Sequence, residues 1–186
     1  MTLWITLGAI ALLVVLVLGW AVAAYNRLVR LRNQVEASWA QIDVQLKRRH
    51  SLIPNLVETV KGYAAHERAT LDAVISARAG AVNAADTSDR AAAEGVLTQA
   101  LGRLFALAEA YPNLKANQNF AALQSELAAT EDKIAYARQF YNSAVQTFNG
   151  AVQSVPTNII AGMGTFPLRP YFEAQAGERT DVNVRF

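Results

Sequence analysis

The chain has 186 residues, a length that favours a single domain, and its 17 Lys and Arg nearly balance its 15 Asp and Glu. It has no cysteine, which excludes disulfides, zinc–thiolate sites, iron–sulfur clusters and thiol nucleophiles. Its hydrophobic fraction of 53% is high for a soluble domain, and no Lys, Arg, Asp or Glu occurs before Arg27.

The first element expected along the chain is a membrane-spanning helix. Leu3–Ala24 is an uncharged apolar run that measures about 33 Å as a helix, enough to cross a bilayer core of about 30 Å. A cleaved signal peptide, with Ala21-Val22-Ala23 as its cleavage site, is the alternative. No Lys or Arg precedes the run, however, and it is longer than the roughly 7–15 apolar residues of a signal sequence. We therefore assign residues 1–26 as a transmembrane anchor.

Positive charge follows the anchor at once, as Arg27, Arg30 and Arg32. The positive-inside rule then places the rest of the chain in the cytoplasm, as part of a single-pass protein of the cell membrane. These three arginines are close enough to the span to contact lipid headgroups, so membrane lipid is an expected partner.

Apolar residues recur at helical spacing through most of the remaining chain. The first helix is expected to continue from the anchor to about His50. Pro54 should kink or end it, and Ser51 should cap a second helix that reaches Ile75. Gly80 and the run 83–89 are expected to form a loop.

Two more helices are expected after that loop. Asp86 or Ser88 should cap the third, which ends before Tyr111-Pro112 because a residue before proline is disfavoured in a helix. The fourth has apolar residues in strict three-four alternation from Phe120 to Phe148, a spacing typical of coiled-coil packing. The predicted fold is all-α: a transmembrane helix, then an antiparallel four-helix bundle over residues 27–154 with long first and last helices.

Residues 155–186 differ in composition from the helices before them, since prolines and glycines alternate there with aromatic residues. We expect an irregular segment rather than a fifth regular helix. Val182, Val184 and Phe186 alternate with polar residues, as in an edge strand or a docking peptide. The segment is too apolar for a disordered tail, and its candidate contacts for assembly are Ile159, Ile160, Phe166, Tyr171 and Phe172.

No arrangement of residues indicates catalysis. The two histidines, His50 and His66, lie in neither a zinc-protease motif nor the Glu-x-x-His pattern of di-iron bundles. The glycines form no phosphate-binding loop. We therefore expect no enzyme activity, no metal and no cofactor.

Lys47-Arg48-Arg49-His50 is the densest basic cluster. It has three interpretations: a solvated helix face or helix end, a protein contact, or a nucleic-acid contact. The first is the most ordinary for such a run, and we predict no nucleic-acid partner.

Several consecutive motifs resemble the LemA family. The longest read WAQIDVQLKRR at Trp39–Arg49, LIPNLVETVKGY at Leu52–Tyr63 and YPNLKANQNF at Tyr111–Phe120. Shorter matches occur at Tyr25–Val29, Arg32–Val35, Glu131–Ile134, Arg138–Asn142 and Pro156–Ala161. The resemblance covers residues 4 to about 174, and Ser51 departs from it, because an acidic residue is common there.

The resemblance implies a bacterial single-pass membrane protein with a helical soluble part. It brings no established activity and no catalytic residues. It also implies envelope partners, a TPM-domain protein or a membrane metallopeptidase. The polar ends of the matched motifs are expected to form one partner surface at the far end of the bundle: Lys47, Arg48, Arg49, Asn55, Asn113, Asn117 and Asn119.

The function predicted from these observations is a membrane-anchored scaffold or adaptor that forms homo-oligomers and recruits envelope proteins. The anchor, the regular apolar seam and the apolar C-terminal segment all favour it. The alternative is a protein that shapes or organises the bilayer as a multi-copy assembly.

Overall fold

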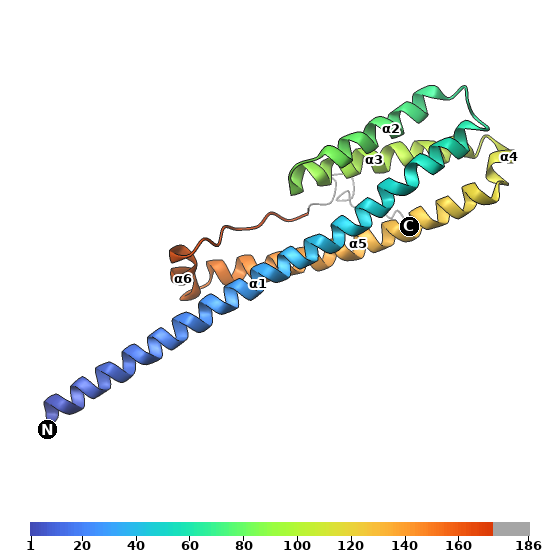
Figure 1. Cartoon of the computed structure of the whole chain (residues 1–186). Helices are drawn as coiled ribbons and strands as arrows, with labels where there is room; N and C mark the ends of the chain where they lie inside the picture. The colour runs from blue at the N-terminus through green and yellow to red at the C-terminus, as the bar shows by residue number, and fades with distance from the viewer. Residues whose placement is uncertain (173–186) are drawn as a thin grey trace, which may run out of the picture. The chain divides into compact units, whose positions relative to one another are not determined.

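The computed structural model describes residues 1–172, and every regular element in that range is a helix (Figure 1). The helices are α1 (Thr2–Lys61), α2 (Arg68–Asn83), α3 (Thr87–Ala108), α4 (Pro112–Lys115), α5 (Gln118–Gln153) and α6 (Thr157–Met163). The chain divides into two compact units. The first holds residues 1–39 and 141–169, and the second holds residues 40–140 and the segment that begins at Pro170. The prediction of an all-helical chain with a long apolar N-terminal helix is confirmed.

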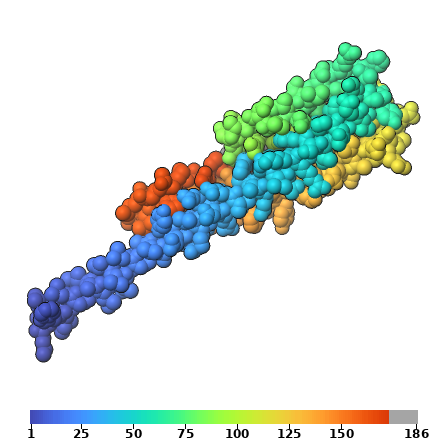
Figure 2. Space-filling model, viewed as in Figure 1, coloured from blue at the N-terminus to red at the C-terminus, as the bar shows by residue number. Residues whose placement is uncertain are grey.

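The first part of α1 is the apolar run, and it is exposed. An 18-residue window there has a mean hydropathy of 2.7 with none of it buried, which makes α1 long and apolar enough to cross a membrane. Figure 2 shows these side chains, in dark blue, uncovered on the face in view. Exposure of so many large apolar side chains is unfavourable in water and favourable in lipid.

Within the first unit, α1 packs against α5. Leu28 of α1 and Phe148 of α5 are fully buried, and the rings of Trp39 and Tyr141 lie 5.4 Å apart between centroids. The segment after α6 returns to α5 through Asn149. The Asn149 side-chain amide donates to the Arg169 carbonyl, and the Arg169 backbone N–H donates to Asn149 Oδ1, both at 2.9 Å. This pair replaces backbone hydrogen bonds that the irregular segment lacks.

The second unit has one buried core, to which α1, α2, α3, α4 and α5 all contribute. Its members include Ile53, Leu56, Val60, Val74, Leu97, Leu104, Leu114, Phe120 and Leu127. Of the two caps predicted for α3, Asp86 is the one found, because its Oδ1 accepts a hydrogen bond from the Asp89 backbone N–H at 2.8 Å. The predicted end of α3 before Tyr111-Pro112 is also confirmed.

The predicted break at Pro54 is wrong, because α1 passes through it and ends at Lys61. Proline has no N–H, so the His50 carbonyl one turn earlier loses its helical donor. Arg78 of α2 supplies the missing donor, with its Nε 2.8 Å from the His50 oxygen. A long-range contact therefore satisfies the carbonyl that the proline leaves open.

The cap assigned to Ser51 is wrong for the same reason. Ser51 lies inside α1, and its hydroxyl donates to the Lys47 carbonyl at 2.8 Å. The chain leaves the helix after Lys61 instead, and α2 then continues past Gly80, which was expected in a loop, to Asn83.

The segment after residue 155 is more regular than expected, since residues Thr157–Met163 form α6. Two of its predicted assembly contacts are unsuitable for that role. Phe166 packs edge-on against Tyr25 with ring centroids 5.5 Å apart, and Phe172 packs on the Arg138 guanidinium, so both are buried within the chain. The predicted strand or docking peptide at Val182–Phe186 lies outside the described residues.

Candidate functional site

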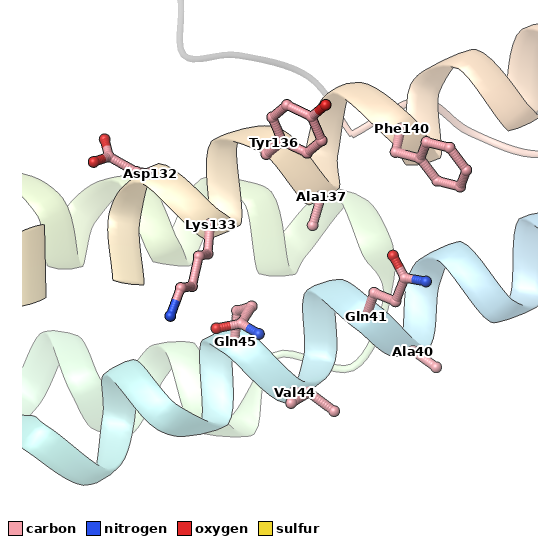
Figure 3. A pocket seen from close by; sticks show the side chains of 9 residues that line it. All are labelled: Ala40, Gln41, Val44, Gln45, Asp132, Lys133, Tyr136, Ala137 and Phe140. Atoms are coloured by element: carbon pink, nitrogen blue, oxygen red, sulfur yellow. The ribbon is translucent and has the colours of Figure 1, made fainter. Parts of the chain in front are cut away.

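The second unit carries an open apolar groove of about 820 Å³ between α1 and α5 (Figure 3). Its walls are Ala40, Gln41, Val44 and Gln45 from α1, and Asp132, Lys133, Tyr136, Ala137 and Phe140 from α5. Both sets repeat at intervals of three or four residues, so each helix presents one stripe to the groove.

The groove exposes large apolar side chains. Tyr136 is 76% exposed, Val44 60% and Phe140 49%. The predicted seam of α5 lies beside them, with Ile134 and Tyr141 buried. A second apolar stripe therefore runs next to the buried one, and nothing in the described residues covers it.

The groove also has a small polar component. Asp132 and Lys133 stand next to each other on α5, and Figure 3 shows Lys133 extending toward α1 near Gln45. Gln45 Oε1 is buried in the wall and has no hydrogen-bond partner within residues 1–172. A buried acceptor without a donor lowers the stability of the fold, so this amide is a local cost within the wall.

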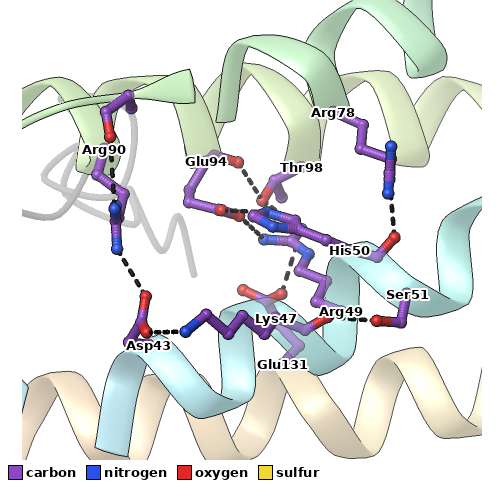
Figure 4. A network of polar contacts seen from close by, with 11 residues as sticks. Asp43, Lys47, Arg49, His50, Ser51, Arg78, Arg90, Glu94, Thr98 and Glu131 are labelled. Carbon is purple, nitrogen blue, oxygen red and sulfur yellow. Dashed lines mark hydrogen bonds and ion pairs between the residues drawn. The ribbon is translucent and has the colours of Figure 1, made fainter. Parts of the chain in front are cut away.

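A polar network lies elsewhere in the second unit and joins three helices (Figure 4). Arg49 of α1 is 4% exposed, and its Nη1 lies 3.0 Å from Glu94 Oε2 on α3. Its Nη2 donates to Thr98 Oγ1 at 2.8 Å and lies 3.3 Å from Glu131 Oε2 on α5. His50 Nε2 is 2.6 Å from the other oxygen of Glu94. Paired and hydrogen-bonded in this way, the charges can remain buried.

A second group of ion pairs involves Asp43, which lies nearly two turns before Arg49 on α1. Asp43 contacts Lys47 at 2.7 Å and Arg90 of α3 at 2.8 Å. These neighbours hold the pKa of Asp43 below its usual value, chiefly through the hydrogen bond from Lys47 and also through the two positive charges, while burial acts in the opposite direction.

The structure separates the predicted partner residues into different roles. Arg49 was expected on a contact surface, and that expectation is wrong because its side chain is buried against Glu94. Lys47 is exposed and paired with Asp43, and Arg48 pairs with Glu126 at the surface.

The predicted asparagines also differ in environment. Asn117 caps α5, since its Oδ1 accepts from the Phe120 N–H at 3.0 Å while its amide donates to Tyr63 at 2.9 Å. Asn55 of α1 and Asn119 of α5 line one shallow depression, and Asn113 is exposed on α4.

The predicted residues next to the anchor lie in the first unit, and those of the C-terminal segment lie in the first unit up to Arg169 and in the second unit from Pro170. Arg27 and Arg30 are exposed, whereas Arg32 lies with its guanidinium carbon 5.7 Å from the centroid of Phe166. Ile159 and Tyr171 are exposed and Ile160 is half-buried.

The groove was not predicted from the sequence, because only the most regular apolar seam of each helix was considered as a contact face. The available signal was a second spacing of four on α5, from Tyr136 to Phe140, displaced from the seam that contains Ala137 and Tyr141. An apolar pair beside a complete seam indicates a second contact face on the same helix.

Comparison with known proteins gives a family and several curated relatives. The model of the LemA family matches residues 38–186. Magnetosome protein MamQ 2 of Paramagnetospirillum magneticum is 26% identical over 184 residues, which cover 85% of this chain and 68% of that protein. Magnetosome protein MamQ of Magnetospirillum gryphiswaldense is 26% identical over 181 residues, covering 83% of this chain and 66% of that protein. Protein LemA of Metamycoplasma hominis is 26% identical over 160 residues, which cover 86% of this chain and 73% of that protein.

Proposed function

The chain belongs to the LemA family, and from this premise we propose that it is a membrane-anchored, non-enzymatic scaffold of the bacterial envelope that assembles from copies of itself. The apolar helix and the relatives indicate a membrane-associated helical protein. The observation that carries self-assembly is the exposed apolar groove between α1 and α5 in the second unit.

The occupant that best suits this groove is the same groove of a second copy. In a two-fold interface, residue i of one copy contacts residue j of the other, and j contacts i. The adjacent Asp132 and Lys133 make the wall complementary to itself, because each acid can face the base of the other copy.

The apolar part of the groove supports the same occupant. Tyr136 and Phe140 repeat the spacing of four by which α5 already packs within the chain, and Val44 of α1 faces the same groove, so helices of a second copy can interdigitate with these side chains. Aromatic residues such as these contribute most to protein interfaces, whereas rim charges contribute mainly to orientation.

Thiol cross-linking in the membrane tests this interface. Since the chain has no cysteine, Tyr136→Cys carries a single thiol at the groove. Mild oxidation of the full-length variant in lipid vesicles should give a disulfide-linked dimer. Val96→Cys, on α3 and outside the groove, is the matched control because Val96 is 57% exposed. Equal and weak cross-linking of both variants would remove the support for a groove-mediated dimer.

We propose that residues 27–154 act as an antiparallel four-helix bundle on the cytoplasmic side of a single-pass anchor, because Arg27, Arg30 and Arg32 follow the span. A TPM-domain protein or a membrane metallopeptidase is the proposed envelope partner, by family resemblance. The depression between Asn55 and Asn119 is its proposed contact.

A second candidate function is a protein that shapes or organises the bilayer as a multi-copy assembly. The observation that favours it is a group of exposed apolar side chains on α6, in the same unit as the anchor. The two roles are compatible, since a self-assembling scaffold that also contacts lipid would impose its arrangement on the membrane.

A further inference from the structure

Three apolar side chains at and just before α6 are exposed. Val155 is 80% exposed, Ile159 60% and Met163 83%. The spacing of four places Ile159 and Met163 on one face of α6, while Ala161 on the other side is buried. The helix therefore presents an apolar face that the described chain leaves uncovered.

The first unit places α6 at the level where the apolar run of α1 ends. Trp39 and Tyr141 are in contact, and α1 and α5 run antiparallel past them (Figure 1). From Tyr141, α5 extends about 18 Å to Gln153, and from Trp39, α1 extends about 21 Å back to Tyr25. The end of α5, and α6 directly after it, thus lie near Tyr25.

Direct contacts support this level. The chain shortly after α6 contacts Tyr25, because Phe166 packs edge-on against its ring. Ala24, the last residue of the apolar run, is buried at 8% exposure although the large side chains before it are exposed. The start of protein packing therefore coincides with the end of the apolar run.

The charge pattern around α6 is that of a membrane interface. No Lys, Arg, Asp, Glu or His occurs from Gln139 to Leu168, so the segment is as free of charge as the anchor. Exposed Arg27 and Arg30 lie just beyond the span on α1, where long cationic side chains reach lipid phosphates. Trp20 and Tyr25, both partly exposed, supply the aromatic residues that favour the headgroup region.

We propose that α6 is an interfacial helix whose face of Ile159 and Met163, with Val155 before it, inserts into the boundary between headgroups and acyl chains of the leaflet next to Tyr25. The occupant is the bilayer surface, because the neighbouring turns of α1 in the same unit enter that bilayer. Arg27 and Arg30 bind lipid phosphates beside it. The interaction fixes the tilt of the first unit at the membrane, and it holds whether or not copies assemble.

Site-directed spin labelling tests the proposal on the full-length chain. The absence of cysteine means that Met163→Cys and Ile159→Cys each carry one nitroxide label. The protein is reconstituted at low density in vesicles of phosphatidylethanolamine and phosphatidylglycerol, and collision rates with oxygen and with a water-soluble nickel chelate are measured. For a label inserted in lipid, the ratio of the collision rate with oxygen to that with nickel should be several-fold higher than for a label exposed to water.

Two control labels make the result specific to the apolar face. Asn158→Cys places a label on α6 one residue from Ile159, on a polar exposed position, and Val96→Cys places one on an exposed apolar position of α3 in the second unit. Both should collide more often with nickel than Met163→Cys does.

Two results would overturn the proposal. A label at Met163 as accessible to nickel as the label at Val96 would show that α6 faces water. A label shielded from both oxygen and nickel, with line broadening between labels, would show that a second copy covers the face instead of lipid.

Discussion

Arg48 and Arg49 are neighbours in sequence but lie on different faces of α1, and the face determines the role of each. Arg48 pairs with Glu126 at the surface, whereas Arg49 is buried between α1, α3 and α5. The sequence indicates a basic cluster at both positions. Only the three-dimensional position of Glu94, more than forty residues away, determines which arginine is buried, so local pattern could not assign the roles.

Removal of Glu94 should destabilise the second unit strongly. Glu94→Ala leaves the buried Arg49 with the half-exposed Glu131 as its only ion-pair partner among the described residues, at 3.3 Å, beside its hydrogen bond to Thr98. Loss of one partner of a buried pair costs roughly 3–5 kcal/mol in the free energy of unfolding. Chemical unfolding of the full-length protein in detergent, followed by circular dichroism, measures the change. Glu126→Ala is the matched control, because its exposed pair with Arg48 should contribute less than about 1 kcal/mol.

The double variant Arg49→Met with Glu94→Leu separates the two explanations of that loss. If the cost arises from an unpaired buried charge, apolar replacement of both partners should recover most of the stability. Equal destabilisation by Glu94→Ala and Glu126→Ala would instead contradict a buried structural role for the network.

At the scale of elements, local sequence signals predicted correctly that the segments are helical, but they predicted only some of the helix ends. The three-four spacing of α5 and the Asp86 cap of α3 depend on residues close in sequence, and both are found as predicted. The continuation of α1 through Pro54 depends on Arg78, a residue of another helix. Local sequence around Pro54 therefore could not predict it. Proline in a helix is tolerated when another group satisfies the open carbonyl, and here that group is a side chain.

Arg78 and Pro54 should therefore be coupled in stability. Arg78→Met leaves the His50 carbonyl without its donor, which should cost about 1–3 kcal/mol in the free energy of unfolding. In the Pro54→Ala background, the backbone N–H restored at position 54 can donate to the same carbonyl, so Arg78→Met should cost much less. A double-mutant cycle measures the coupling, with Arg103→Met on the exposed surface of α3 as the control. Additive effects of the two substitutions would contradict the proposed compensation.

At the scale of the whole molecule, composition and periodicity predicted an all-helical chain with an apolar N-terminal helix, and the motifs predicted its family. The division into two units was not predicted, because the change occurs inside α1 and α5 with no proline, glycine or change in composition at residues 39–40 or 140–141. The groove was missed for a similar reason, since a contact face beside a complete seam is recognised only when neighbouring helices are placed.

The apolar side chains of the two units have different proposed partners. In the first unit the exposed apolar surface lies on the N-terminal run of α1 and on α6, which suits lipid. In the second unit, three exposed apolar side chains, Val44, Tyr136 and Phe140, line one groove, which suits a second copy of the protein. A scaffold that assembles on a membrane needs both kinds of surface.

The mass of the full-length protein in detergent, measured by light scattering with the detergent contribution subtracted, tests self-assembly through the groove most directly. The wild-type chain should form a discrete dimer or larger oligomer. Tyr136→Lys should reduce the mass to that of one chain, 20.2 kDa. The substitution adds a second lysine to the groove, and across a two-fold axis it would face and repel the same positive charges of the other copy. Val96→Lys, outside the groove, should leave the oligomer intact. A wild-type mass of one chain, or an oligomer that Tyr136→Lys leaves unchanged, would contradict assembly through this surface.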